Sequence, residues 1–306
     1  MKVLVATQKP FAPVAVEGIR EIVREVGYEF SLLEKYEDES ELIAAVADAD
    51  ALIVRSDKVT ASVLAAAPRL RIVVRAGAGY DNIDLDACTA KGVAAMNTPG
   101  QNSNAVAELA VAMMIFMARG QFTPSTGSEI SGKTLGVQAF GNVGRLVARK
   151  AGALGMKVLA TDPFLTPEQI REGGAEPVGS VEELYARSNF VSVHVPATPQ
   201  TVGSIGRDLL CRMPKNAVLV NTARKEVIDE AGLEQALEER PDLKYVTDVA
   251  PGNYEALRGK FGLRVFATPK KMGAQTAEAN INAGLAAARQ IVAYFRDGDE
   301  KFRLNK

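Results

Sequence analysis

The sequence has very few of the residues from which metal sites and hydrolytic triads are built. Its 306 residues include one histidine, two cysteines and no tryptophan. The histidine, His194, lies inside an apolar run, so we expect a hydrogen-bonded core imidazole and no catalytic triad. Cys88 and Cys211 form no metal-binding or redox spacing. These absences exclude most hydrolase and metalloenzyme functions, and no metal is expected.

Excess charge and long apolar runs are absent as well. The 36 basic and 37 acidic residues give a formal net charge of −1, so nothing indicates a surface for nucleic acid or an anionic membrane. The apolar stretch at 107–118 is shorter than a membrane span, and the apolar run at 3–6 is shorter than a signal-peptide core. With so few cysteines, we expect a cytoplasmic protein in a reducing compartment.

The segment 135–164 has the layout of a dinucleotide-binding unit. Residues 135–139 predict a buried strand, a turn with Gly141 and Gly144 follows, and a helix then runs to Gly155. A second strand, 156–161, ends at Asp162. In such a unit the helix N-terminus faces a pyrophosphate, and the acid binds a ribose hydroxyl.

Two details qualify this prediction. Ala139 stands where the three-glycine pattern has its first glycine, so the glycines alone would also fit an ordinary strand–helix turn. Asp162 at the end of the second strand favours the dinucleotide interpretation. Because its carboxylate would repel a 2′-phosphate, we expect NAD and not NADP as the cofactor.

Strands and helices alternate along the rest of the chain. This alternation predicts doubly wound parallel sheets with helices on both faces, in about two domains. The other expected strands are 3–6, 29–33, 51–55, 71–74, 93–96, 190–195, 217–220, 245–249 and 265–268. The other expected helices are 14–26, 40–47, 61–67, 85–91, 104–119, 166–172, 181–186, 230–239 and 275–296. Helix 104–119 is apolar on almost every side, so it is buried in a core or against a second subunit, and we favour a dimer contact.

Polar residues follow two strands of the first hundred residues, where parallel sheets bind ligands. Arg55 and Lys58 follow one strand, and Arg75 ends the other, followed by Gly77 and Gly79. Backbone N–H groups at such glycines can form a nest for a carboxylate. Each base alone would be a common surface residue. Together they indicate a doubly anionic ligand.

Motifs along nearly the whole chain resemble the D-2-hydroxyacid dehydrogenase family, and in particular its members that oxidise phosphoglycerate. The motifs are VRSDKVT (54–60), RAGAGYDNIDL (75–85), MNTPGQNSNAVAEL (96–109), AFGNVG (139–144), HVPAT (194–198), VNTARKEVIDE (220–230) and TPKKMGAQTAEA (268–279). The resemblance implies a flavodoxin-like substrate domain, 1–97 with 278–306, and a Rossmann NAD-binding domain, 98–277. It also implies hydride transfer between a hydroxy acid and NAD, in a homodimer formed through the nucleotide domain.

The motifs and the resemblance assign roles to individual residues. Arg224 matches the arginine that holds the substrate carboxylate and carbonyl, and Asp248 matches an acid near the nicotinamide amide. Substrate binding is expected at Arg55, Ser56, Lys58, Arg75, Ala76, Gly77, Ala78, Gly79 and Asn102. NAD binding is expected at Ala139, Gly141, Asn142, Val143, Gly144, Asp162, His194, Val195, Pro196, Thr201, Thr222, Ala223, Arg224, Asp248 and Gly273.

The catalytic pair of the family is replaced. Lys271 stands where the family has a histidine, and Asn253 where it has a glutamate, which resembles a lysine-type subgroup of the phosphoglycerate enzymes. A lysine with an ordinary pKa of about 10.4 is a poor base at neutral pH. Removing the glutamate, adding Lys270 and Arg224, and burial would all favour the neutral amine. We therefore expect Lys271 to be the general acid/base, assisted by Lys270.

Alternatives remain open at this point. Both lysines could bind only an anion, with water carrying the proton. The substrate could be hydroxypyruvate, glyoxylate or D-lactate within the same fold. A protein that senses NAD without catalysis is a more distant alternative, because the usual catalytic pair is missing.

Overall fold

The computed structural model describes residues 1–305, which fold into two compact units. Unit 1 comprises Met1–Asn102 and the chain from Gln275 onward, and unit 2 comprises Ser103–Ala274. The expected domains are 1–97 with 278–306, and 98–277. Their boundaries differ by a few residues from the boundaries of the two units. Lys306 lies outside the described residues. Within residues 1–305, no helix combines the length and the apolar character needed to cross a bilayer.

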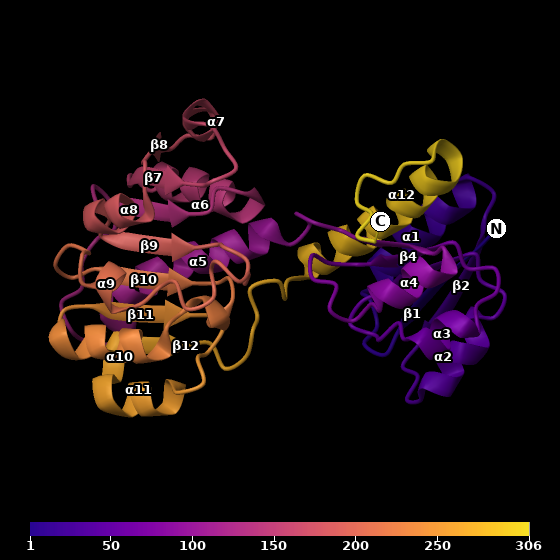
Figure 1. Ribbon diagram of the computed structural model, residues 1–306, viewed down its shortest axis with the longest axis horizontal. Helices are drawn as coiled ribbons and strands as arrows, with labels where there is room; N and C mark the ends of the chain where they lie inside the picture. Colours follow the sequence, from indigo (N-terminus) through magenta and orange to yellow (C-terminus); the bar gives the residue numbers. More distant parts are fainter. Residues whose placement is uncertain (306) are drawn as a thin grey trace. The chain divides into compact units, whose positions relative to one another are not determined.

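Unit 1 is built on a five-stranded parallel sheet with the order β2-β1-β3-β4-β5. Its strands are β1 (Lys2–Thr7), β2 (Glu29–Glu34), β3 (Ala51–Val54), β4 (Ile72–Arg75) and β5 (Ala94–Asn97). Its helices are α1 (Pro13–Glu25), α2 (Glu39–Val46), α3 (Ala61–Ala65), α4 (Leu85–Lys91) and α12 (Ala277–Asp297). Residues of α1 and α12 cover one face of the sheet, and residues of α2, α3 and α4 cover the other (Figure 1).

Unit 2 is built on a seven-stranded parallel sheet with the order β12-β11-β10-β9-β6-β7-β8. Its strands are β6 (Thr134–Gln138), β7 (Lys157–Thr161), β8 (Glu176–Pro177), β9 (Phe190–Val193), β10 (Val218–Asn221), β11 (Lys244–Thr247) and β12 (Val265–Ala267). Its helices are α5 (Ser103–Ala118), α6 (Asn142–Ala153), α7 (Pro167–Glu172), α8 (Val181–Arg187), α9 (Arg207–Leu210), α10 (Glu230–Glu239) and α11 (Tyr254–Phe261), with single 3₁₀ turns η1 (Gly120–Phe122), η2 (Lys225–Val227) and η3 (Gly262–Arg264).

Both sheets have doubly wound topologies, which confirms the expected fold class. The order in unit 1 is flavodoxin-like, and the order β8-β7-β6-β9-β10-β11 in unit 2 is that of a Rossmann domain. In such sheets ligands bind at the carboxyl ends of the strands, beside the point where the strand order reverses. In unit 2 that point lies between β6 and β9, which are hydrogen-bonded neighbours.

The apolar helix α5 is buried in the core of its own unit. Ala107, Ala110 and Met114 are completely buried in a cluster that also contains residues of α6 and β10. The core alternative therefore accounts for most of its apolar surface, so these buried faces do not require a second subunit.

Candidate active site

The turn after β6 leaves the N-terminus of α6 open to a ligand. Gly141 is the N-cap residue of α6, with no side chain to cap the first N–H groups. Gly141 and Asn142 are exposed. A Cβ atom on Gly144 would lie 2.3 Å from the carbonyl oxygen of Ala139, so glycine is needed where the helix approaches the strand. The uncapped helix end suits an anionic pyrophosphate.

Ala139 takes a backbone conformation that normally belongs to glycine. Its φ is +73°, in the left-handed region. The turn is therefore the one that a three-glycine fingerprint makes, formed here with a methyl group on its first residue. Because an L-residue pays roughly 1–2 kcal/mol in this region, the surrounding structure holds Ala139 in a strained state.

Asp162 lies beside this turn and binds its backbone. Its Oδ2 accepts a hydrogen bond from the N–H of Phe140 at 2.8 Å, and its Oδ1 accepts one from the N–H of Phe164 at 2.9 Å. Each carboxylate oxygen keeps further acceptor capacity. Asp162 thus positions the turn and is still able to accept a bond from a ribose hydroxyl.

A cavity of about 610 Å³ opens next to Asp162. It brings together four of the expected cofactor residues, namely Ala139, Asp162, Val195 and Thr201. Much of its remaining wall is apolar, from residues such as Leu165, Ile170, Pro177, Val178 and Leu209. An apolar cavity with a carboxylate at one side fits the adenosine half of a dinucleotide.

A second cavity of about 360 Å³ contains the expected catalytic residues. Arg224, Lys270 and Lys271 line it together with Asp248 and Thr268. These residues follow the carboxyl ends of β10, β11 and β12, so they share an edge of the sheet with the first cavity. Both lysines are exposed. Lys270 and Arg224 therefore line the same cavity as Lys271, as expected, whereas the expected burial of Lys271 is not found.

Buried Asn221 holds the turn that carries Arg224. Its Nδ2 donates to the carbonyl oxygen of Arg224 at 2.9 Å, and its Oδ1 accepts from the N–H of Ala223 at 2.9 Å. Thr222, in the same turn, has a buried hydroxyl with no hydrogen-bond partner in residues 1–305. A bound ligand can supply the missing hydrogen-bond partner, so the unpaired hydroxyl favours a ligand site at this turn.

Asp248 holds the loop that carries the two lysines. Its side chain is almost completely buried. Oδ1 accepts hydrogen bonds from the Thr268 hydroxyl and the N–H of Met272, and Oδ2 accepts one from the N–H of Gly273, each at 2.8 Å. The sequence suggests only an acid near the nicotinamide amide. The structure adds a role in fixing residues 268–273.

His194 is a neutral imidazole close to the first cavity. Its Nε2 lies 2.9 Å from the hydroxyl of Ser192, and its backbone N–H donates to the carbonyl oxygen of Gln138. Burial lowers the pKa of His194 to about 4. It therefore carries no charge at neutral pH, and it orders the strand end that leads to Val195.

In unit 1, Arg55 and Arg75 lie side by side with Gly77. Nε of Arg75 donates to the carbonyl oxygen of Arg55 at 2.9 Å, and a Cβ on Gly77 would lie 1.6 Å from Nη1 of Arg75. Burial lowers the pKa of both arginines, and the neighbouring Arg55 lowers that of Arg75 further. Neither arginine appears among the ion pairs of residues 1–305, which all involve other bases.

Arg55 is held firmly. Its guanidinium donates to the carbonyl oxygens of Lys9 and Pro10 at 3.0 and 2.9 Å and to Oδ1 of Asn280 at 2.7 Å, and it stacks over the ring of Phe11. Asp57 and Asp81 act on Arg55 and Arg75 electrostatically, but neither carboxylate forms an ion pair with them. Two partly buried guanidinium groups without such a pair are suited to an anion.

The structure does not group Lys58 with these arginines. Lys58 and Ser56 line a separate cavity of about 470 Å³ with Gln8, Tyr36 and Asp57. Buried Asp57 fixes this arrangement, because its carboxylate accepts from the N–H of Gln8 and the hydroxyl of Tyr36. Of the remaining expected residues, Ala76, Gly77, Ala78 and Gly79 follow β4, Asn102 precedes α5, and Pro196 and Gly273 follow β9 and β12.

Comparison with known proteins places the chain in a family. Residues 105–269 match the family described as D-isomer specific 2-hydroxyacid dehydrogenase, NAD binding domain. The chain therefore belongs to the D-isomer specific 2-hydroxyacid dehydrogenases, and unit 2 contains the NAD-binding domain of that family.

Its relatives include enzymes named D-3-phosphoglycerate dehydrogenase. The one from Mycobacterium tuberculosis is 38% identical over 268 residues, which cover 83% of this chain and 51% of the relative. The one from Methanocaldococcus jannaschii is 39% identical over 271 residues, which cover 84% and 52%. The chain thus spans about half the length of these relatives. A structure of NAD⁺-bound 3-phosphoglycerate dehydrogenase from Entamoeba histolytica is 47% identical, with a TM-score of 0.85, and covers 100% of this chain and 99% of that one.

Proposed function

We propose that the protein oxidises D-3-phosphoglycerate to 3-phosphohydroxypyruvate with NAD, the first step of serine synthesis. The substrate assignment rests on Arg55 and Arg75, which are partly buried, adjacent and not ion-paired with a carboxylate of the described residues. Two guanidinium groups suit a dianionic phosphate. The names of the relatives support the same substrate.

Each end of the substrate has a proposed partner. Arg55 and Arg75 bind the phosphate, and Arg224 binds the carboxylate and the carbonyl oxygen at C2. NAD, when bound, accepts the hydride that leaves C2. Gly141 to Gly144 hold its pyrophosphate, and Asp162 holds its ribose. Lys58 is left out of the phosphate site because it lines a different cavity.

A substrate panel tests this assignment. We expect turnover with D-3-phosphoglycerate and NAD, and lower kcat/KM with D-glycerate and D-lactate. Arg75→Gln should reduce kcat/KM for D-3-phosphoglycerate by about tenfold to a hundredfold, the effect of one charge-assisted hydrogen bond, and leave D-glycerate nearly unchanged. Lys58→Gln is the matched control. An equal loss for both substrates in Arg75→Gln would rule out the phosphate role.

Lys271 is the proposed general acid/base. The C2 hydroxyl proton passes to its amine as the hydride leaves, and returns from its ammonium in the reverse reaction. Lys271 lines the same cavity as Arg224, the proposed partner of the substrate carboxylate, which supports this role. Lys271→Met should abolish turnover while NADH still binds, whereas Lys270→Met should keep measurable turnover. Near-normal turnover in Lys271→Met would show that water carries the proton and that the lysines only bind an anion.

The assembly and the location are further parts of the proposal. We propose a homodimer formed through the nucleotide domain. The support is an apolar surface near the end of α5, where Phe122 is 70% exposed and packs edge-on against Phe116. Cys88 and Cys211 are both free thiols, which agrees with a cytoplasmic location. Light scattering on the purified chain tests the dimer, and a monomeric mass would reject it.

A further inference from the structure

A third cavity in unit 2 lies at the opposite edge of the sheet from the cofactor residues. It has a volume of about 430 Å³ and is lined from the amino ends of β6, β9, β10 and β11 and from the loop before β6. Each of these strands has four or five residues, which separates the two edges by roughly 13 Å. The cavity is therefore distinct from the two cavities at the carboxyl edge.

Three lysines line this cavity, and no acidic residue does. Lys133 precedes β6, Lys215 precedes β10, and Lys244 begins β11. None of these three lysines forms an ion pair with a described residue, in contrast to Lys2, Lys150 and Lys260. The cavity thus brings three basic residues together without an acidic one.

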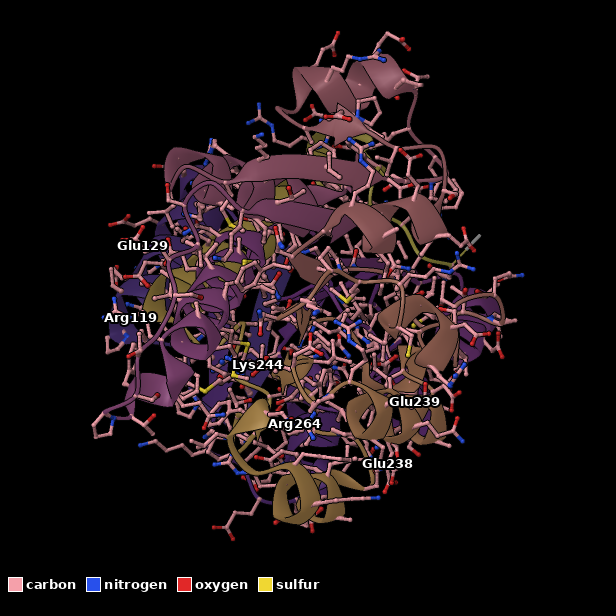
Figure 2. All side chains as sticks on the ribbon, turned by 90° about the vertical axis from the view of Figure 1, so that its left-hand side faces the viewer. Arg119, Glu129, Glu238, Glu239, Lys244 and Arg264 are labelled. Carbon is pink, nitrogen blue, oxygen red and sulfur yellow. The ribbon has the colours of Figure 1, made fainter. Side chains whose placement is uncertain are left out.

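Lys244 is the most constrained of the three. It is half-buried, and its Nζ donates to the carbonyl oxygen of Met117 near the end of α5 at 3.2 Å. Burial lowers the pKa of Lys244. Figure 2 labels Lys244 near the middle of the view, with Arg119 and Glu129 to its upper left. An anion at this position would offset the cost of the partly desolvated ammonium.

Hydroxyl groups from one ordered loop complete the wall. Ser125, Thr126 and Ser128 all line the cavity. The N–H of Ser128 donates to the carbonyl oxygen of Ala118 at 2.8 Å, which fixes the loop against the end of α5. A Cβ on Gly127 would lie 2.9 Å from Cα of Arg119, so the loop packs closely there. The loop backbone is thus held in place where its serine and threonine residues share the wall of the cavity with the lysines.

The nearest acids along the chain do not neutralise the site. Asp242 accepts a hydrogen bond from the N–H of Asn216, but it is paired with Arg240 at 2.7 Å. Glu129 follows Ser128 and is exposed, and it does not line the cavity. The net charge of the lining residues is therefore strongly positive.

We propose that this cavity binds a small, multiply charged phosphate compound, at a site separate from the cofactor and the substrate. Lysine ammonium groups act as point charges for phosphate oxygens, and serine and threonine hydroxyls donate to the same oxygens. The volume is in the range of small-ligand sites. The wall is too polar for an apolar ligand. This inference does not depend on the proposed oxidation reaction.

Calorimetric titration of the whole chain with inorganic pyrophosphate tests the site. Saturating NADH is present throughout, so that the N-terminus of α6 is occupied. We expect the double variant Lys133→Gln/Lys215→Gln to bind at least about tenfold more weakly than the unmodified chain, because two charged contacts are lost. Lys157→Gln is the matched control, since Lys157 begins the neighbouring strand β7, is exposed and does not line the cavity.

Two companion measurements complete the test. Lys215→Gln alone should weaken binding in the same direction. Because pyrophosphate can also bind the anion site proposed at Arg55 and Arg75, each titration is repeated in the Arg75→Gln background, where the loss caused by the lysine substitutions should persist. Equal affinity in the double variant and the unmodified chain would overturn the proposal, as would no binding of pyrophosphate at millimolar concentration. Binding of citrate in place of pyrophosphate would show that the site is not selective for phosphate and would also overturn it.

Discussion

The role of Asp248 in holding the lysine loop leads to a sharp prediction for Asp248→Asn. The substitution keeps the size of the side chain and one acceptor oxygen, but it replaces the other oxygen by an NH₂ group. That group would face either the N–H of Gly273 or the donors at Thr268 and Met272, all now 2.8 Å from a carboxylate oxygen. At least one buried donor therefore loses its acceptor.

The expected cost follows from these three hydrogen bonds. Leaving a buried donor unsatisfied costs about 1–3 kcal/mol, and loss of the charge weakens the bonds that remain. We expect the free energy of unfolding of unit 2 to fall by about 2–4 kcal/mol, which corresponds to roughly 5–15 °C in Tm for a unit of this size. Because a displacement of about 1 Å in a catalytic group can cost about a hundredfold in rate, kcat should fall by about that factor.

Thermal unfolding and steady-state kinetics on the same samples provide the assay. Asp242→Asn is the matched control, since Asp242 also accepts a backbone N–H and pairs with Arg240, but does not contact the lysine loop. It should lose stability and keep kcat. Thr268→Val, which removes only one donor, should show a smaller loss of both.

The competing explanation makes a different prediction. If Asp248 acts mainly on the nicotinamide amide, Asp248→Asn will raise KM for NAD and leave Tm nearly unchanged. A Tm within about 1 °C of the unmodified protein would refute the hydrogen-bond argument, because three buried bonds cannot be disturbed at so small a cost.

Three further predictions concern the cofactor half. Ala139→Gly should raise the free energy of unfolding by about 0.5–1 kcal/mol in urea titrations, as release of the left-handed strain outweighs the added chain entropy; a loss of stability would contradict this. Imidazole NMR should show His194 titrating near pH 4. The free energy of unfolding should then be unaffected by His194 above about pH 6.5, and should fall by up to about 1.4 kcal/mol per pH unit as the pH drops from 6.5 towards 4. His194→Gln should abolish this slope, and an unchanged slope would reject the prediction. Asp162→Asn should reduce the preference for NAD over NADP by roughly tenfold in fluorescence titrations, and an unchanged preference would show that the charge does not select the cofactor.

The sequence predicts the sheets well because their strands are short, continuous apolar runs. Residues 51–55 and 217–220, for example, match β3 and β10 to within one residue. Helices α9 and α11 do not appear in the prediction. The first is a single turn, and the second, with Arg258, Gly259 and Lys260 in its last turn, has too little apolar periodicity to stand out.

The candidate site is predictable where the argument depends on strand order, and less so where it depends on turns. Parallel strands bring their carboxyl ends to one edge, so the grouping of Arg224, Lys270 and Lys271 in one cavity follows from the pattern. Lys58 separates from Arg75 because Asp57 binds Gln8 and Tyr36 and directs the turn after β3. Such contacts span 49 and 21 residues, and no local pattern reports them.

No sequence motif marks the amino ends of the strands in unit 2. Lys133, Lys215 and Lys244 are isolated lysines in the sequence, each at the start of a strand or shortly before it. Only the strand order makes them neighbours around one cavity. The site lies at the amino ends of the strands, away from the carboxyl ends where parallel sheets usually bind ligands.

The central claim is that the protein transfers a hydride from C2 of D-3-phosphoglycerate to NAD. The most direct test uses D-3-phosphoglycerate deuterated at C2, with proton NMR of the reduced cofactor after turnover. We expect deuterium at C4 of the reduced nicotinamide ring, with loss of the corresponding proton signal. Reduced cofactor without deuterium, or no reduced cofactor, would contradict it.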